Sequence, residues 1–218
     1  ESEAMSKPFY KKFNVPKGLK YFEIALKANP NDEELMVSLS YLYEGMNQLD
    51  KATLLLERLI TTNPSVENYL RLGHITTKMN KYQAALTYYQ SAFQIERNNV
   101  PVLLGIGTCY DLLNKPDSAI LFYKSAIMID TANLNLKKRL VDLYTKLDLY
   151  DELVELCREI LKKDQFEYEV RRNLGYGLYK NNKKQEALEQ FLIAASMNPH
   201  DSYGLFHAAR IYVDMGQY

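Results

Sequence analysis

Residues that could carry out catalysis or bind a metal are few in this 218-residue chain, and their spacing supports neither activity. The histidines, His74, His200 and His207, lack the spacing of metal ligands, and no G-x-S-x-G, H-E-x-x-H or P-loop pattern occurs. Gly175 and Gly177 stand two residues apart, but inside a predicted helix, whereas a phosphate-binding loop precedes a helix. The sequence therefore predicts that the chain is not an enzyme and uses no metal or cofactor.

The two cysteines, Cys109 and Cys157, do not indicate a disulfide or a metal site. Two thiols in a chain of this length are not a disulfide framework, and no other ligand-type residue is spaced to join them. We expect both to be buried thiols.

Bulk composition excludes several further classes of protein. Hydrophobic residues make up 47% of the chain and charged residues 25%, which is typical of a folded protein. Lys+Arg and Asp+Glu balance at 27 each, so the mean charge gives no support to nucleic-acid binding. No apolar run is long enough to span a membrane. The expected compartment is the cytoplasm, with the periplasm as the alternative, and the Lys-, Asn- and Tyr-rich composition suggests a bacterial source.

The strongest pattern in the chain is a repeat. A small residue returns every 33 or 34 positions, with one leucine in the series: Gly18, Ala52, Ala85, Ala119, Leu153 and Ala187. A larger core residue follows each by four positions and another core residue by seven. A fixed period of 20–50 residues is typical of a solenoid, in which each unit buries its apolar face against its neighbours.

Each period reads as two helices. Apolar residues between Tyr82 and Phe93 recur at helical spacing, and Asn80 lies in the preceding turn. The pairs Asn29-Pro30, Asn63-Pro64 and Asn198-Pro199 end helices, and Asn31, Ser65 and Asp201 stand where N-caps are needed. No strand pattern competes, so the expected fold is all-α. Helices are predicted at 17–28, 32–46, 49–62, 66–79, 82–96, 100–113, 116–129, 133–147, 150–163, 167–180, 184–197 and 201–215.

The repeat resembles the tetratricopeptide repeat family over essentially the whole chain. One unit reads Tyr69, Leu72-Gly73, Ala85, Tyr89, Ala92 and the next Leu103, Ile106-Gly107, Tyr110, Ala119, Tyr123, Ala126. The resemblance implies an α-solenoid of stacked antiparallel helix pairs forming a right-handed superhelix. The units would be 1–32 (a partial N-terminal repeat), 33–65, 66–99, 100–133, 134–167 (divergent), 168–201 and 202–218 (truncated, first helix only).

Small residues within each unit suggest how its two helices cross. We expect Gly73, Gly107 and Gly175 to face Ala85, Ala119 and Ala187, respectively. The divergent unit has Val141, Leu153 and Ile160 where small residues are usual, and Cys157 in the aromatic position. We interpret this as an exchange of volumes within one close-packed core.

The resemblance also implies where a partner binds, because the first helix of each repeat lines a concave groove in this family. The C-terminal half of that groove would be basic with interleaved aromatics, which suits a partner peptide with acidic and apolar side chains. The predicted binding residues are Lys138, Arg139, Arg172, Asn173, Tyr176, Tyr179, Tyr203, Phe206, His207 and Arg210.

Some members of the family hold chaperone C-termini with a two-carboxylate clamp. Lys138 and Asn173 match two of its five positions, whereas Asp142, Tyr203 and His207 do not. The acidic side chain of Asp142 would repel a ligand carboxylate, so this function is not expected here.

The leading hypothesis is therefore a non-catalytic scaffold that binds a protein or peptide partner. The alternative is a structural subunit or self-associating arm of a larger assembly, or of a longer protein with another domain outside these residues. Natural arrays carry a polar cap, so the truncated last repeat suggests part of a longer protein. Its open face, with Leu205, Ala208 and Tyr212, would be a site of self-association.

Overall fold

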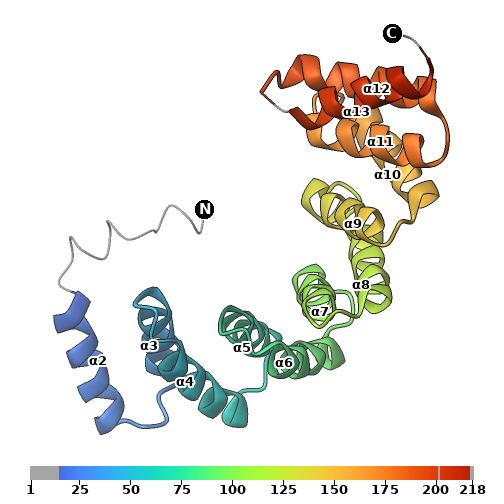
Figure 1. The fold of residues 1–218 in the computed structure, drawn as a ribbon. Coiled ribbons are helices and arrows are strands. Elements are labelled where there is room, and N and C mark those ends of the chain that lie inside the picture. The colour runs from blue at the N-terminus through green and yellow to red at the C-terminus, as the bar shows by residue number, and fades with distance from the viewer. Residues whose placement is uncertain (1–14, 201, 217–218) are drawn as a thin grey trace. The chain divides into compact units, whose positions relative to one another are not determined.

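The computed structural model describes residues 15–200 and 202–216, which contain twelve α-helices and no strand (Figure 1). This confirms the predicted all-α fold, and each helix begins and ends within two residues of its predicted bounds. The helices are α2 (Val15–Ala28), α3 (Glu33–Gly45), α4 (Leu49–Thr62), α5 (Val66–Lys78), α6 (Tyr82–Ile95), α7 (Val100–Leu112), α8 (Pro116–Ile129), α9 (Leu134–Lys146), α10 (Tyr150–Lys163), α11 (Tyr168–Lys180), α12 (Lys184–Met197) and α13 (Ser202–Asp214).

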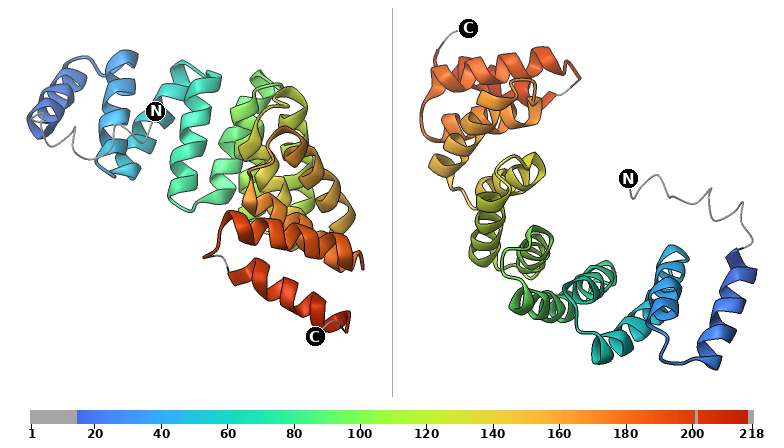
Figure 2. Two further views of the ribbon diagram at one scale, coloured as in Figure 1. Left: turned by 90° about the horizontal axis from the view of Figure 1, so that it is seen from above. Right: turned by 180° about the vertical axis from the view of Figure 1, so that it is seen from behind.

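The chain divides into two compact units, residues 1–119 (unit 1) and 120–218 (unit 2), with the division inside α8. Within each unit, consecutive helices pack against one another as antiparallel pairs (Figure 2). The first helices of neighbouring pairs also touch, α5 with α7 in unit 1 and α9 with α11 in unit 2. Each unit is therefore a helical stack in which first helices share one side.

The turn inside each helix pair is made by one residue in the left-handed region. Asn47, Asn80, Asn114, Asp148 and Asn182 have φ values of 57–59° and recur at the repeat period. Asparagine and aspartate tolerate this conformation better than most residues with a side chain. The short turn that results reverses the chain, so the second helix runs back along the first.

Polar side chains cap the N-termini of the first helices α3 and α5. Ser65 accepts a hydrogen bond from the backbone N–H of Asn68 (3.3 Å), as predicted for an N-cap. The prediction of Asn31 as a cap was wrong: α3 begins at Glu33, and Asp32 accepts from the N–H of Leu35 instead (3.0 Å). The predicted cap Asp201 lies outside the described residues.

Two glycines in unit 1 border the same buried aromatic ring. A Cβ atom at Gly73 would lie 2.6 Å from Cε1 of Tyr89, and one at Gly105 would lie 2.5 Å from the same atom. The Tyr89 ring comes from α6 and is buried between α5 and α7. The glycines are therefore required because a bulky ring fills the space beside them.

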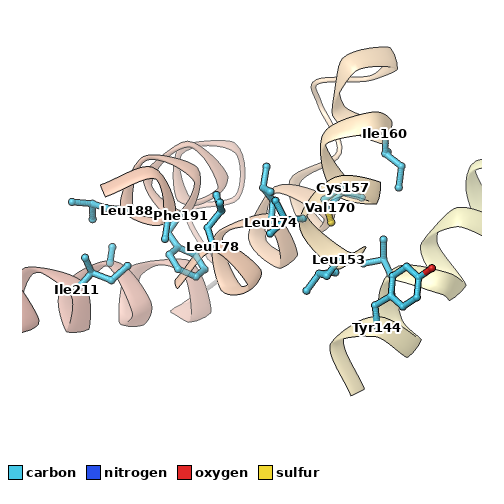
Figure 3. Close-up of a cluster of buried hydrophobic side chains, with 14 of the residues drawn as sticks. Tyr144, Leu153, Cys157, Ile160, Val170, Leu174, Leu178, Leu188, Phe191 and Ile211 are labelled. Carbon is cyan, nitrogen blue, oxygen red and sulfur yellow. The ribbon is translucent and has the colours of Figure 1, made fainter. Parts of the chain in front are cut away.

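The core of unit 2 follows the same rule with other side chains (Figure 3). A Cβ atom at Gly175 would lie 3.0 Å from the ring of Phe191, so here too the glycine borders a ring. One repeat earlier, Val141 and Cys157 occupy the equivalent positions, and both are buried. A larger residue in the glycine position accompanies a smaller one in the ring position, as a volume exchange requires.

Both cysteines are buried, as predicted. Burial raises the pKa of the Cys109 thiol, and it raises the pKa of Cys157 to about 12. A thiol with a raised pKa is a poor nucleophile because little thiolate is present. The two side chains are part of the packing.

Candidate functional site

The predicted binding residues all lie on the first helices of unit 2. Arg172, Asn173, Tyr176 and Tyr179 belong to α11. Their spacing of three or four residues places Arg172, Tyr176 and Tyr179 along one side of that helix. The helix α13 contributes Tyr203, Phe206, His207 and Arg210, and α9 contributes Lys138 and Arg139.

The structure brings the α11 and α13 residues together around His207. The imidazole ring stacks on Phe191, with centroids 5.2 Å apart and planes 15° apart. Its centroid lies 4.4 Å from that of Tyr203, and 6.0 and 6.2 Å from those of Tyr176 and Tyr179. These five residues, which we call the aromatic cluster, join three helices through ring contacts.

His207 is the buried centre of the aromatic cluster and only 8% exposed. Burial lowers the pKa of its imidazole, and the positive charges of Arg210 and Lys180 lower it further. Its Nδ1 atom has no hydrogen-bond partner among the described residues. The side chain therefore stays neutral at physiological pH and holds the rings in place, whereas Phe206 beside it is 63% exposed.

Cations lie over the tyrosine rings of this cluster. The guanidinium of Arg172 is 5.0 Å from the Tyr203 ring, and that of Arg210 is 5.6 Å from the Tyr179 ring. Lys180 Nζ is 5.5 Å from the rings of both Tyr150 and Tyr176. A ring face attracts a cation without neutralising its charge.

One acidic side chain borders the same surface. Asp214 accepts a hydrogen bond from the Tyr179 hydroxyl (2.9 Å) and lies 3.8 Å from Lys184 Nζ. The hydrogen bond to the carboxylate is the main cause of the raised pKa of Tyr179. Arg210 and Lys180 form no ion pair with Asp214 in the described part of the chain.

The α9 residues are placed differently. Lys138 Nζ pairs with Glu167 at 2.5 Å, which compensates its charge just before α11 begins. Arg139 is exposed and Asn173 half-buried. None of the described contacts links Lys138 or Arg139 to the aromatic cluster. We call the side formed by α11 and α13, with Arg172, Tyr176, Tyr179, Tyr203, Phe206 and Arg210, the α11–α13 face.

Sequence reasoning missed Phe191 and Tyr150 at this site. Phe191 lies on α12 and stacks on His207, and Tyr150 at the start of α10 meets the Tyr176 ring edge-on at 6.0 Å. Both belong to second helices, whereas the family resemblance directs attention to first helices. The signal was the aromatic position of the repeat, which Phe191 occupies.

The matching first helices of unit 1 carry a different cluster. The guanidinium of Arg71 lies 3.4 Å from the centre of the Tyr41 ring, and Glu44 pairs with Lys78 at 2.8 Å. Arg71 and His74 each lie 3.9 Å from the same carboxylate. Here one carboxylate lies near three basic side chains.

The described residues contain neither a metal-binding cluster nor a membrane-spanning helix. No group of three or more His, Cys, Asp or Glu residues within them could hold a metal ion. Within the same residues no helix is long and apolar enough to cross a membrane. The side chains gathered at the α11–α13 face are aromatic rings and cations.

Comparison with known proteins places the chain among helical-repeat proteins. The tetratricopeptide repeat family model matches residues 66–99 and 100–133. Hsp70-Hsp90 organizing protein 3 of Arabidopsis thaliana is 28% identical over 104 residues, or 47% of this chain, and Hsp70-Hsp90 organizing protein 2 of the same plant is 24% identical over 110 residues, or 50%. The matched segment spans only 19% of the length of each relative.

Solved structures share the fold. YrrB, a tetratricopeptide repeat protein with an unusual peptide-binding site, has a TM-score of 0.73 at 18% identity, over 87% of this chain and 97% of its own. MamA has a TM-score of 0.70 at 14% identity, covering 78% and 93%, and a tetratricopeptide repeat protein from Parabacteroides merdae has 0.68 at 11%, covering 96% and 83%. The chain therefore contains two adjacent tetratricopeptide repeats that the family model matches, and it shares its helical-repeat fold with these solved structures.

Proposed function

We propose that this chain is a non-catalytic interaction scaffold, and that its α11–α13 face binds an extended partner segment with acidic and apolar side chains. Tetratricopeptide repeats are generally scaffolds for protein–protein interaction. The observation that carries the finer proposal is the set of cations lying on tyrosine rings: Arg172 on Tyr203 and Arg210 on Tyr179.

The side chains of this face fit that class of partner. Arginine offers paired donors that match a carboxylate, and tyrosine offers a rigid apolar surface with a polar tip. Phe206 and Tyr203 are 63% and 37% exposed, so apolar area is available beside the charges. Holding Arg172 and Arg210 on rings in advance reduces the side-chain entropy that binding would cost.

A two-carboxylate chaperone clamp is not proposed for this face. Of the clamp positions, Lys138 is already paired with Glu167 and His207 is buried inside the aromatic cluster. Asp142 stands where the clamp has a neutral asparagine, and Tyr203 stands where it has a lysine. The partner should therefore present acidic groups spaced along a segment, with apolar side chains between them.

A peptide library displayed on phage, selected against residues 1–218, would supply ligands whose affinity can be measured by calorimetry. Arg172→Ala and Tyr176→Ala should each lower the affinity for the selected ligand at least tenfold, because buried arginine and tyrosine contacts are the usual hot spots of interfaces. Glu34→Ala and Glu67→Ala in unit 1 should change the affinity less than twofold. Ligands indifferent to all four substitutions would contradict the proposal.

A second candidate function is assembly through the outer side of α13. Leu205 and Val213 are 49% and 59% exposed there, and Tyr212 is 38% exposed. The prediction that Ala208 belongs to this open side was wrong, because it is 3% exposed and packed in the unit 2 core. Self-association would appear as a concentration-dependent sedimentation coefficient that Leu205→Gln abolishes.

A further inference from the structure

A hollow on the other side of unit 2 has a composition that the α11–α13 face does not share. A groove of about 560 Å³ lies between the second helices α8 and α10. The first helix α9 supplies its floor with Leu140 and Tyr144, and Ile127, Met128 and Leu156 extend the apolar lining. We call this hollow the α8–α10 groove.

The α10 rim of this groove is acidic. Glu152, Glu155 and Glu159 recur at spacings of three and four residues, so they line one side of α10 over two turns. Glu159 accepts a hydrogen bond from the buried Lys137 at 2.6 Å. Glu152 and Glu155 have no partner among the described residues, and on the α8 rim Lys124 lies 5.7 Å from the Tyr144 ring.

Two other charged side chains of α10 have partners on the next helix pair. Asp151 accepts a hydrogen bond from Asn181 at 2.7 Å, and Arg158 pairs with Glu186 at 2.7 Å. The next helix pair therefore supplies partners for the charged side chains that face it, while Glu152 and Glu155 at the α8–α10 groove are left for an external partner.

The equivalent groove in unit 1 has the same apolar floor and the opposite charges. It lies between α2 and α4, with Leu39 and Tyr43 from α3 beneath. Each charged lining residue there is replaced 101 positions later by one of opposite charge or by an apolar residue: Glu23 by Lys124, Lys51 by Glu152, Arg58 by Glu159 and Lys27 by Met128.

This inversion shows that the repeat fold does not dictate the rim charge. Leu39 and Leu140 correspond, as do Tyr43 and Tyr144, so packing retains the floor. Rim charges that packing leaves free to change sign can set the choice of partner, because opposite charges attract one ligand and repel another.

Exposed apolar side chains adjoin the α8–α10 groove. Met128 is 81% exposed and Leu121, two helical turns earlier on α8, is 62% exposed. Methionine is flexible and polarisable, which suits it to contact with an incoming apolar side chain. A partner on the groove would cover both.

We propose that the α8–α10 groove binds a basic amphipathic segment of a partner protein. Its lysines or arginines would meet Glu152 and Glu155, and its apolar side chains would lie on Met128, Leu156 and Tyr144. The segment would be a helix of at least two turns, since the glutamate rim extends about 10 Å along α10. This goes beyond the proposed function, because it uses other helices and a ligand of opposite charge.

A 14-residue lysine–leucine amphipathic peptide is a suitable probe, with its glutamate–leucine counterpart as the charge control. In protein with ¹³C-labelled methionine methyl groups, the lysine peptide should shift the Met128 signal and leave that of the buried Met36 in unit 1 unchanged. The glutamate peptide should not shift the Met128 signal. A lysine peptide that leaves Met128 unshifted, or does not bind at millimolar concentration, overturns the proposal.

Matched variants locate the binding energy. The double substitution Glu152→Lys with Glu155→Lys should lower the affinity for the lysine peptide at least tenfold. Glu189→Lys, at an exposed carboxylate of α12, should change that affinity less than twofold. All three sites are exposed, so circular dichroism should show unchanged folding. An equal loss of affinity from Glu189→Lys and from the groove substitutions would indicate attraction to net charge alone. A loss caused by Tyr176→Ala would place the peptide on the α11–α13 face, and either result overturns the proposal.

Discussion

Replacing Gly105 with alanine should destabilise unit 1, although alanine favours a helix more than glycine does. The new Cβ atom would lie 2.5, 2.6 and 2.7 Å from Cε1, Cζ and Cδ1 of Tyr89, whereas ordinary contact begins at 3.4 Å. The ring would have to move by about 0.9 Å, and the equally close approach of Gly73 leaves it little room. Tyr89 is 5% exposed, so the surrounding core would have to shift with it.

The magnitude follows from two opposing effects. Overpacking a core costs about 1–3 kcal/mol, and replacing a helical glycine by alanine returns about 1 kcal/mol. The net loss at Gly105 should be about 1 kcal/mol. At Gly18 nothing lies within 4 Å of the new Cβ atom, so the same substitution should stabilise by about 0.5–1 kcal/mol. At Gly175 the new Cβ atom would be 3.0 Å from Phe191, so the change in stability should lie between those at Gly105 and Gly18.

Urea unfolding followed by circular dichroism would measure these changes, with tyrosine fluorescence as a second probe because repeat arrays can unfold in steps. A double-mutant cycle tests the cause: in a Tyr89→Leu background, Gly105→Ala should cost less than in the native chain. An increase in stability from Gly105→Ala as large as that from Gly18→Ala would refute the argument from the ring.

Further predictions concern the unit 2 core and its titratable groups. Leu153→Ala should cost about 2–5 kcal/mol in urea unfolding because Leu153 is fully buried, whereas Leu121→Ala, at a site 62% exposed, should cost less than about 0.5 kcal/mol. Cys157, with its pKa raised to about 12, should react with a disulfide reagent at pH 8 much more slowly in the folded protein than in urea, and equal rates would contradict its burial. His207 has a lowered pKa in the folded state, so the unfolded chain binds its proton first and the free energy of unfolding should fall as the pH drops below about 6.5. Histidine NMR should show this pKa rising in Arg210→Gln, and a native pKa above 6.5 would contradict the assigned burial.

Much of the fold could be predicted from the sequence because the same local pattern occurs in several repeats. The 34-residue period, the stripe from Tyr82 to Phe93 and the turn at Asn80 depend on residues close together in the chain, and the helices begin and end where these signals place them. The burial of Cys109 and Cys157 followed from the same register. Capping was predictable to within one residue, as Asp32 in place of Asn31 shows.

The candidate site was predictable only as a set of helix positions. The register placed Arg172, Tyr176 and Arg210 on first helices, but their sequence spacing does not reveal that the cations lie over tyrosine rings. Nor does it reveal that Phe191 on a second helix stacks on His207 and so buries it. Such contacts depend on the helix crossing and on side-chain rotamers, which a one-dimensional pattern does not contain.

The sequence by itself determined that this protein is a stack of helix pairs with buried small and aromatic positions. Only the tertiary structure decided that Gly73 and Gly105 serve one ring, and that Lys51 and Glu152 stand at equivalent places in two grooves. The physical reason is that periodicity reports which side of a helix is buried, whereas the neighbour it meets is set by contacts across the stack. Those contacts join residues more than 15 positions apart in the chain.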